Sequence, residues 1–250
     1  QKYGAKIVTE RVTKLERDEE TGLFTATWGS GCVQAHKVLL ATGVSNRRPP
    51  MDEALHDEAL ARGLIRYCPI CDGFEVTDKK VGVIGSDSHG VAEALFIRSY
   101  TADVTLIAPD KALHLKPDDR EKLKEAAIGC VDGPALAAAI SDEFIVVETA
   151  EGPHTFDSVY PALGSDTHVQ LAEQVSAALS KDCNLTVDSH ERTSVPGLYA
   201  AGDVVIGLDQ ISHAMGEGGV AATTIRNDLC SEKPRLREPT EVMEEAESGS

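Results

Sequence analysis

The chain has 250 residues, of which 42% are hydrophobic and 26% are charged, and its formal net charge is −17. Such a composition is typical of a globular protein with one large or two ordinary hydrophobic cores. The negative charge argues against nucleic acid or an anionic membrane as a partner, and no apolar run reaches the roughly 18 residues that a membrane span needs.

The first 62 residues predict an antiparallel three-stranded meander followed by a short helix. Apolar and polar residues alternate in three stretches, separated by turns at Gly22 and Gly31. The third stretch ends in an apolar run at 38–41, which predicts burial in a larger sheet. The expected strands are 5–17, 24–28 and 32–41, and the expected helix is 52–62.

Residues 66–73 read Arg-Tyr-Cys-Pro-Ile-Cys-Asp-Gly and contain the C-x-x-C pair Cys68 and Cys71. Cysteines at this spacing come within one helical turn, so a disulfide between them can open and close. A thiol at a helix N-terminus has a lowered pKa, and the thiolate is its reactive form. Asp72, next to Cys71, is placed to move a proton to or from a sulfur. Half of a zinc site and a buried thiol pair are the alternative interpretations.

Cysteine usage bears on these alternatives. The six cysteines include only this one close pair, whereas a small secreted disulfide framework would show more. A redox-active pair in a reducing cytosol fits better, and the expected location is cytoplasmic. No second C-x-x-C or H-x(3–5)-H motif is present to complete a zinc site, so no metal is expected.

Directly after the C-x-x-C, the sequence predicts a βαβ unit of the dinucleotide-binding type. A buried strand runs into a turn bounded by Gly85 and Gly90, and a helix and a second buried strand follow. The expected ranges are 80–84, 91–99 and 103–108, then a helix at 118–127, a hairpin at 144–148 and 154–156, and a strand at 159–163 leading back to the first domain.

The last third of the chain predicts two helices and a buried strand. An amphipathic helix is expected at 168–180, a short strand at 185–187, and a buried strand at 198–201 that ends at Gly202 and Asp203. The final helix, 209–229, has an apolar face that includes Ile211 and Met215. Three glycines near its start indicate that something large lies against this end. Residues 233–250 are expected to form a disordered acidic tail.

Four blocks occur in the order seen in thioredoxin reductases and related flavoprotein disulfide reductases, and over residues 1–230 the chain resembles that family. The blocks are Ala41-Thr42-Gly43, the C-x-x-C with its Asp-Gly, the βαβ unit behind it, and the run 197–203 followed by Gln210-Ile211. The resemblance implies an α/β fold with two Rossmann-like, three-layer ββα dinucleotide-binding domains. The NAD(P)-type domain, 63–157, would carry the C-x-x-C and be inserted in an FAD-type domain formed by 1–62 and 158–232.

The same resemblance implies roles for single residues. Cys68 and Cys71 would exchange electrons with the flavin and with substrate, and Asp72 would be the acid for the departing thiolate. Backbone that passes close to a cofactor, and the N–H groups at the start of the last helix, would hold the FAD. The residues implied to bind cofactors are Ala41, Thr42, Gly43, Gly202, Asp203, Gln210, Ile211, Gly85 and Gly90.

The chain departs from the family pattern at two places. Relatives begin with a βαβ unit that binds the FAD pyrophosphate, and this sequence starts after it. If the chain is complete as given, we expect poor FAD affinity and an exposed sheet edge in the first domain. In the second glycine turn Asp87 replaces the middle glycine, where a carboxylate repels a pyrophosphate. The His-Arg-Arg run of NADPH-dependent relatives is here Ala108-Pro109-Asp110, which argues against NADPH and favours NADH if either.

The leading interpretation is therefore a flavin-dependent thiol–disulfide oxidoreductase resembling thioredoxin reductase. The expected partner is a thioredoxin-like protein or a small dithiol or disulfide, and the relatives imply a homodimer. One alternative is a dithiol oxidase or a ferredoxin-dependent reductase with a non-functional NADPH site. Another is a non-catalytic fragment or interaction domain without FAD.

Overall fold

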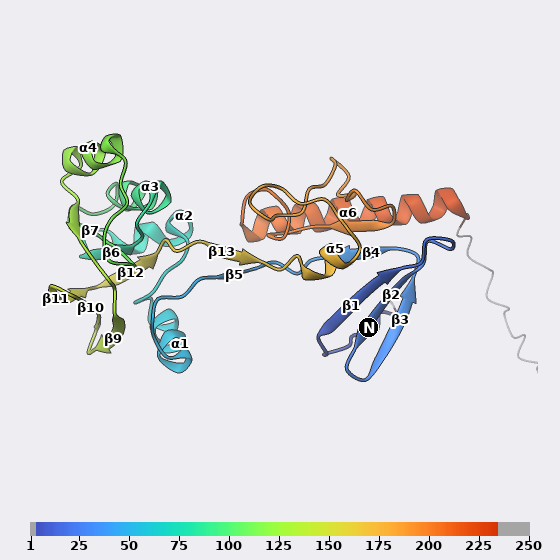
Figure 1. Cartoon of the computed structure of the whole chain (residues 1–250), viewed down its shortest axis with the longest axis horizontal. Helices are drawn as coiled ribbons and strands as arrows, with labels where there is room; N and C mark the ends of the chain where they lie inside the picture. Colours follow the sequence, from blue (N-terminus) through green and yellow to red (C-terminus); the bar gives the residue numbers. More distant parts are fainter. Residues whose placement is uncertain (1–3, 235–250) are drawn as a thin grey trace, which may run out of the picture. The chain divides into compact units, whose positions relative to one another are not determined.

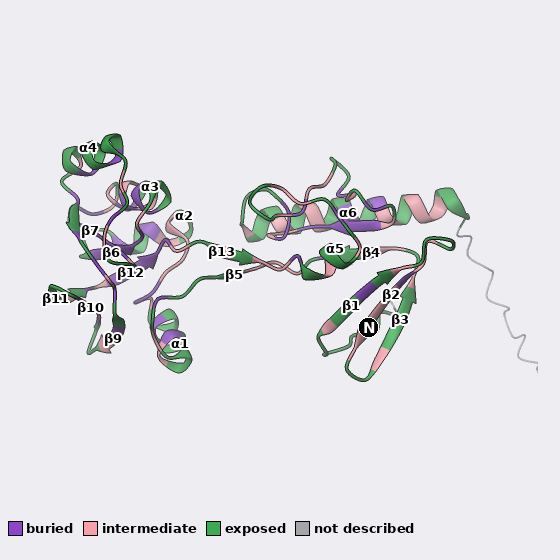
Figure 2. Cartoon of the chain, in the orientation of Figure 1, coloured by how far each residue is buried: buried purple, intermediate pink, exposed green. Residues whose placement is uncertain are grey.

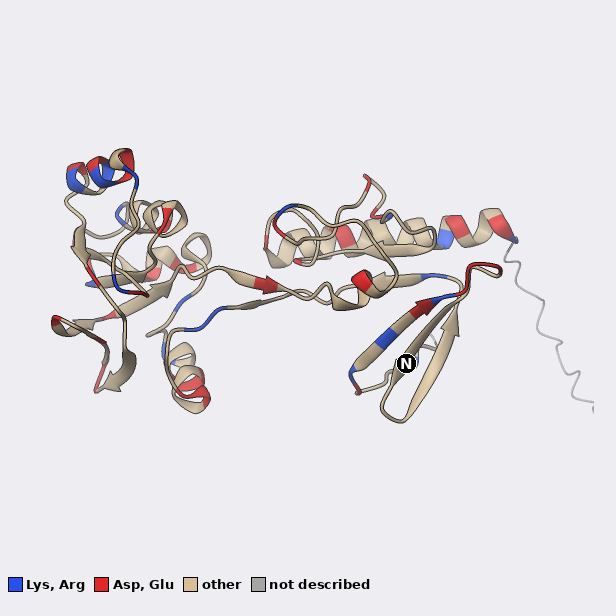
Figure 3. Cartoon of the chain, in the orientation of Figure 1, with Lys and Arg blue, Asp and Glu red and all other residues tan. Residues whose placement is uncertain are grey.

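The computed structural model describes residues 4–234, which belong to two compact units (Figure 1). Residues 45–166 form one, called the inserted unit below, and the segments before and after them form the other, called the split unit. Within the described residues, no helix is long and apolar enough to cross a membrane. Acidic residues stand on helices of both units, including α1 (Glu53–Ala61), α4 (Pro117–Glu125) and α6 (Ile211–Glu232) (Figure 3). All but the first two residues of the tail expected at 233–250 lie outside the described residues.

The split unit begins with the predicted meander. The strands β1 (Val12–Arg17), β2 (Phe24–Trp28) and β3 (Gly31–Ala35) pair antiparallel in that order. The third predicted strand is in fact two, because the chain turns at 36–37 and β4 (Val38–Leu40) leaves the meander. There it pairs in parallel with β14 (Leu198–Ala200), which was predicted as a buried strand.

One helix and one strand that were predicted in the split unit are shorter in the structure. The helix expected at 168–180 is only α5 (Gln170–Gln174), because the backbone turns left-handed at Ser176, where φ is +59°. The strand expected at 185–187 is reduced to single bridges made by Leu185. The core of this unit packs the meander, β4, β14 and α5 around Phe24 and Leu198, neither of which is exposed.

The final helix is observed as α6 (Ile211–Glu232), and its predicted apolar face is not its buried face. Ile211 and Met215 are 83% and 73% exposed, while the buried residues of α6 are Ala221 and Thr224. At the glycines 216, 218 and 219, no described atom other than those of the chain neighbours and the nearby backbone of α6 itself lies within 4 Å of the place where a Cβ would stand. No other part of the described chain therefore packs against α6 at these three glycines.

The inserted unit has the three layers that the resemblance implied. Its central sheet is parallel, in the order β12-β6-β7-β8, and the helices α3 and α4 belong to one face. An antiparallel sheet, β11-β10-β9, and the helix α1 pack against the other face through a second buried cluster. Figure 2 shows buried residues concentrated in the central strands of this unit. The layers therefore follow the order β, β, α.

The predicted βαβ unit and hairpin of this unit are confirmed. The strand β9 was missed, and β12 joins the central sheet beside β6 instead of leading directly out of the unit. The elements are α1 (Glu53–Ala61), α2 (Pro69–Asp72), the 3-10 turn η1 (Gly73–Val76), β6 (Val81–Ile84), α3 (Ser88–Ile97), β7 (Val104–Ile107), α4 (Pro117–Glu125), β8 (Gly129–Val131), β9 (Ala137–Ser141), β10 (Phe144–Thr149), β11 (Gly152–Phe156) and β12 (Ser158–Pro161).

The chain passes between the two units twice, through β5 (Val44–Asn46) and β13 (Ser165–Thr167), which pair with each other. The compact units divide at 44/45 and 166/167, whereas the sequence placed the boundaries at 62/63 and 157/158. Residues 45–62, which lie between the two N-terminal boundaries, pack within the inserted unit, because Ala59 belongs to its second buried cluster and Met51 packs against that cluster. Which cofactor each unit serves stays a prediction.

Candidate redox site

The C-x-x-C pair lies at the start of the short helix α2. Cys68 is its N-cap and Pro69 its first residue, and the N–H groups of Cys71 and Asp72 donate to the Cys68 carbonyl at 2.9 and 3.2 Å. Proline suits this position because its fixed φ is helical and its missing N–H would have no helical partner. A disulfide joins Cys68 and Cys71, whose Cα atoms are 5.2 Å apart. Cys71 is exposed and Cys68 half-buried, so a dithiol can reach the bond.

Two exposed apolar side chains stand next to this disulfide in the sequence. Ile70 is 64% exposed and Phe74 is 80% exposed. Gly73 between them is buried against the ring of Tyr100, and a Cβ on it would lie 2.8 Å from a ring carbon. The turn from α2 into η1 therefore needs a glycine, and it presents Ile70 and Phe74 to solvent.

Asp72 is held on both carboxylate oxygens. Tyr160, a fully buried residue of β12, donates its hydroxyl to Oδ1 at 2.7 Å. Arg66 approaches Oδ2 at 3.0 Å with one guanidinium nitrogen and contacts Glu75 at 2.8 Å with another. Its Nε donates to the Gly63 carbonyl at 3.1 Å, which fixes the guanidinium in place.

The protonation of these partners follows from their surroundings. Burial raises the pKa of Tyr160, and its bond to Asp72 raises it further, so the hydroxyl stays protonated and donates. Burial alone would lower the pKa of Arg66, but its hydrogen bonds to Glu75 and Asp72 outweigh this and raise it. The sequence drew attention to Asp72 but missed its two partners, Tyr160 and Arg66, and Glu75, which contacts Arg66. An arginine and a glutamate flanking the C-x-x-C were a visible signal, whereas Tyr160 is 88 residues away.

In the glycine turn after β6, the carboxylate of Asp87 occupies the backbone N–H groups at the start of α3 (Ser88–Ile97). Asp87 is the N-cap of α3, and its Oδ1 accepts hydrogen bonds from the N–H groups of His89 and Gly90 at 3.0 and 3.2 Å. Backbone N–H groups at such a helix start are what a dinucleotide pyrophosphate would bind. The two glycines of the motif keep their packing role, because a Cβ on Gly85 would lie 2.9 Å from the Cα of Gly90. The turn therefore does not fit a nicotinamide dinucleotide.

The cofactor-binding residues predicted in the split unit gather at one sheet edge. Because β4 and β14 are parallel neighbours, 41–43 and 202–203 both follow the carboxyl ends of adjacent strands. Gly43 and Gly202 have φ of +64° and +77°, a conformation that favours glycine. The Gly202 N–H donates to Glu217 Oε2 at 2.6 Å. The opposite oxygen of Glu217 is 2.8 Å from His213 Nε2.

Thr42 and the start of α6 complete this edge of the split unit. The Thr42 hydroxyl donates to the His168 carbonyl at 2.7 Å, and the His168 N–H donates to the Gly43 carbonyl at 3.0 Å. Gln210 is the N-cap of α6, and Ile211 is its exposed first residue. Glycine backbone beside an uncovered helix start fits the flavin end of FAD. The residues Ala41, Thr42, Gly43, Gly202, Asp203, Gln210 and Ile211 thus lie in the split unit, and Cys68, Cys71, Asp72, Gly85 and Gly90 in the inserted unit.

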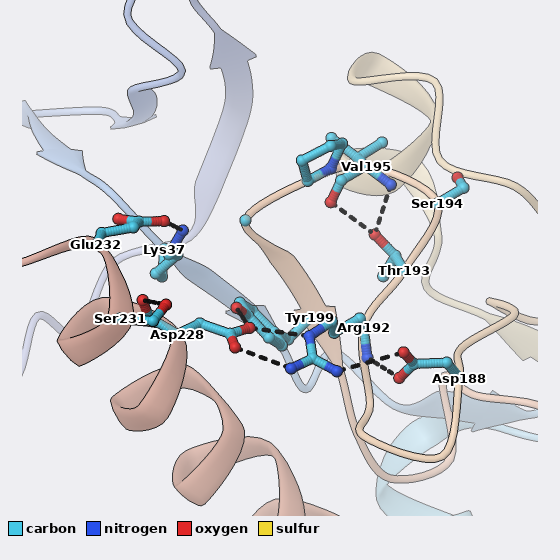
Figure 4. Close-up of a pocket in the computed structure, with 12 residues that line it drawn as sticks. Lys37, Asp188, Arg192, Thr193, Ser194, Val195, Tyr199, Asp228, Ser231 and Glu232 are labelled. Carbon is cyan, nitrogen blue, oxygen red and sulfur yellow. Dashed lines mark hydrogen bonds and ion pairs between the residues drawn. The ribbon is translucent and has the colours of Figure 1, made fainter.

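A cavity of about 440 Å³ in the split unit contains none of the predicted site residues (Figure 4). Its charged side chains are bonded to one another: Arg192 donates twice to Asp228, at 2.9 and 2.8 Å, and Tyr199 donates to Asp228 at 2.6 Å. These bonds, that of Arg192 first, lower the pKa of Asp228 to about 2. Lys37 pairs with Glu232 at 2.5 Å. The cluster ties α6 to β14 and to the segment that carries Arg192.

The remaining cysteines form no disulfide within the described residues, and three of the four are exposed. They are Cys32, Cys130, Cys183 and Cys230. Partial burial raises the pKa of the Cys130 thiol. Across residues 4–234, no group of three or more His, Cys, Asp or Glu side chains is arranged to hold a metal ion.

Comparison with known proteins gives one consistent family. Residues 2–218 match the sequence model of the family described as pyridine nucleotide-disulphide oxidoreductase. A thioredoxin reductase of Listeria innocua is 28% identical over 209 residues, which make up 79% of this chain and 64% of the relative. One of Treponema pallidum is 31% identical over 232 residues, or 88% of this chain and 72% of the relative.

The fold agrees with these sequence matches. The crystal structure of HlmI matches 92% of this chain and 73% of its own, with a TM-score of 0.81 and 27% identity. This chain spans less than two thirds of the length of the Listeria relative. The family match nevertheless covers more than half of the chain and includes the C-x-x-C and both parallel sheets. The chain therefore belongs to the pyridine nucleotide-disulphide oxidoreductase family.

Proposed function

We propose that the chain is a flavin-dependent thiol–disulfide oxidoreductase in which electrons pass between FAD and the Cys68–Cys71 pair. The observation that carries this proposal is the disulfide itself, which is accessible at a helix start beside a held carboxylate, in a chain of this family. FAD, when bound, would supply a two-electron acceptor or donor for the pair. The inserted unit would present the disulfide, and the split unit would bind the cofactor.

The chemistry of the pair is thiol–disulfide exchange. A substrate thiolate attacks one cysteine sulfur, the bond between the two cysteine sulfurs breaks, and the other cysteine leaves as a thiolate. The second substrate thiol then attacks the mixed disulfide. The products are a substrate disulfide and two reduced cysteines, which hold the two electrons and the two protons. Reduction of a substrate disulfide is the same sequence in reverse, and Asp72 is the group that moves the proton.

The residues proposed to hold the flavin are those at the carboxyl ends of β4 and β14 and at the start of α6. Gly43 and Gly202 would let the backbone approach the cofactor, and Asp203 would accept a hydrogen bond from its hydroxyl groups. At the start of α6, the Ile211 N–H would face the polar edge of the flavin ring, where the helix dipole favours negative charge, whereas the Gln210 N–H already donates to the Leu208 carbonyl at 2.8 Å.

The electron partner on the cofactor side is proposed not to be a nicotinamide dinucleotide. Asp87 already accepts the two N–H groups that a pyrophosphate would need. This observation favours the second candidate function, a dithiol oxidase or a ferredoxin-dependent reductase. The exposed Ile70 and Phe74 suit a substrate with an apolar surface, either a thioredoxin-like protein or a small apolar dithiol or disulfide. A cytoplasmic homodimer is part of the same proposal.

The test is a visible absorption spectrum of the purified chain after incubation with FAD, recorded under nitrogen. A flavin band that bleaches with dithiothreitol, and does not bleach when Cys71 is replaced by serine, is the expected result. Bleaching by NADPH or NADH would overturn the second candidate. A chain that binds no flavin at all would contradict the proposed function and favour a non-catalytic interaction domain.

A further inference from the structure

The face of α6 that packs against β14 is charged in the first two turns of the helix. Ala221 and Thr224 are the buried residues of α6, and Glu217 and His213 precede Ala221 on the same face by one and two turns. The Glu217 side chain is only 12% exposed. A carboxylate held this far from solvent is costly unless it is bonded, so its partners show what keeps it there.

Glu217 connects α6 to the turn that follows β14. Its Oε2 accepts the Gly202 N–H at 2.6 Å, and its Oε1 lies 2.8 Å from His213 Nε2. The Gly202 carbonyl accepts the Val205 N–H at 2.8 Å, so both backbone groups of Gly202 are bonded. Asp203, inside this turn, is the residue proposed to accept a hydrogen bond from the cofactor. Because bonds to a charged acceptor are about twice as strong as neutral ones, Glu217 fixes the position of this turn.

A second carboxyl group, that of Glu191, lies close enough to Glu217 for their charges to interact. Glu191 is 8% exposed, and among the residues that the structure describes its Oε2 has no hydrogen-bond partner. Its backbone is left-handed, with φ of +61°, and its carbonyl accepts the Ala200 N–H of β14 at 3.1 Å. Burial raises the pKa of Glu191, and the charge of Glu217 raises it further. The backbone therefore keeps a buried acid near the carboxylate that bonds Gly202.

The charged groups that face Glu191 offer its ionised form only a shared histidine. They are Glu217 and His213 from α6, and Asp188 from the same segment as Glu191. Asp188 is another acid and also raises the pKa of Glu191. His213 lowers this pKa, but its Nε2 already contacts Glu217. Ionisation of Glu191 would thus put a second negative charge beside Glu217.

We propose that Glu217 is a positioning residue that holds the Gly202–Asp203 turn in the arrangement that receives the flavin, and that ionisation of Glu191 weakens this hold as the pH rises. The first part rests on the proposed function and names a residue behind its cofactor site. Neutral Glu191 leaves Glu217 bonded to Gly202, whereas ionised Glu191 repels it. Because the pKa of Glu191 is raised in the folded chain, the hold is complete below the ordinary value of 4.5 and weakens as the pH rises through the raised value.

The test is the hydrogen exchange of the Gly202 amide in the full chain, and it needs no flavin. Ala201–Gly202 is the only place in the sequence where glycine follows alanine, so ¹³C-carbonyl alanine combined with ¹⁵N-glycine isolates this amide in an NMR spectrum. Dividing each exchange rate by the intrinsic rate at the same pH gives the protection of the Gly202 N–H. Glu217→Ala should lower this protection about tenfold or more near pH 6, the order expected for losing a hydrogen bond to a charged group.

Two matched variants separate this hold from general stability. Glu217→Gln keeps an oxygen that can accept the N–H and should retain part of the protection. Glu232→Ala removes a paired carboxylate from the other end of the same helix, where it contacts Lys37, and should leave the protection of Gly202 unchanged. For the second part, the protection in the unsubstituted chain should fall between about pH 5.5 and 8, and in Glu191→Gln it should stay level.

Binding of FAD, followed by flavin fluorescence, adds a readout that a purely structural role would not move. Glu217→Ala should weaken FAD binding about three- to tenfold, and by no more than the factor by which Gly202 loses protection, because the cofactor must then order the turn itself. Glu232→Ala should bind FAD as the unsubstituted chain does.

The outcomes separate the parts of the inference. Unchanged Gly202 protection in both Glu217 variants would overturn the first part, as would an FAD affinity that Glu217→Ala leaves intact. Protection that falls with pH equally in Glu191→Gln would overturn the second part. If Glu217→Ala loses its circular dichroism, Glu217→Gln carries the test. A chain that binds no FAD would instead contradict the proposed function, and the exchange rates would then still decide whether Glu217 holds the turn.

Discussion

The carboxylate of Asp87 can be removed in two ways that separate its charge from the space it occupies. Asp87→Asn removes the charge but leaves an oxygen able to accept the N–H groups of His89 and Gly90. Asp87→Gly removes both and frees the two N–H groups. Glycine is tolerated at a helix N-cap at a cost of only a few tenths of a kcal/mol, so neither change should unfold the inserted unit.

The expected gain in binding follows from the geometry. A phosphate oxygen at these N–H groups would take the place of Oδ1, which lies 3.0 and 3.2 Å from the two nitrogens. Two unit charges 4 Å apart repel by about 1 kcal/mol in water and about 4 kcal/mol near a protein surface. A freed N–H adds about 1.5–3 kcal/mol when it bonds a charged oxygen. Taking the lower figure of each range, Asp87→Asn, which removes only the repulsion, should bind ADP-ribose about 5-fold better than the unsubstituted chain, and Asp87→Gly, which also frees an N–H, about 60-fold better.

Titration calorimetry with ADP-ribose measures this without flavin or turnover. Glu125→Gln is the control, because it removes the same charge from an exposed position on α4 of the same unit. Equal affinity of Asp87→Asn and Asp87→Gly for ADP-ribose would mean that charge repulsion alone, and not the occupied N–H groups, prevents binding of the pyrophosphate. An unsubstituted chain that binds ADP-ribose as tightly as Asp87→Gly would refute the reasoning.

Three further changes test other parts of the structure. Gly73→Ala places a Cβ 2.8 Å from the Tyr100 ring and should lower the free energy of unfolding by about 1–3 kcal/mol, measured by urea titration. An unchanged urea midpoint would mean that the ring moves aside freely. The lowered pKa of Asp228, about 2, means that its carboxylate stabilises the fold above the unfolded value near 3.8 and that this contribution is lost as the pH falls through 2. Asp228→Asn should therefore cost at most about 1 kcal/mol at pH 7, because solvent screens the partly exposed pair, and progressively less as the pH falls from about 4 through 2. A pH-independent difference in thermal unfolding would contradict this assignment. Phe74→Ser should reduce kcat/KM for a protein disulfide or dithiol about tenfold, the order expected for losing one buried aromatic contact, and leave the rate with dithiothreitol unchanged; equal losses with both would rule out a docking role.

Local patterns predicted the inserted unit well. Glycine turns, short apolar runs and caps are properties of neighbouring residues, and they located α1, β6, α3, β7 and the hairpin of β10 and β11 to within a few residues. The same patterns failed where tertiary contacts determine where an element ends. The helix expected at 168–180 stops at Gln174, because the Ala177 N–H returns to the Ala172 carbonyl and the chain turns left-handed at Ser176.

The site shows the same division between local and distant information. The charge of Asp87 was visible in the motif, and its repulsion of a pyrophosphate could be predicted from that alone. Its role as the cap of α3 depends on where the helix begins, which the sequence placed three residues too late. Tyr160 reaches Asp72 only because β12 pairs with β6, and no pattern within the segment 66–73 carries that information.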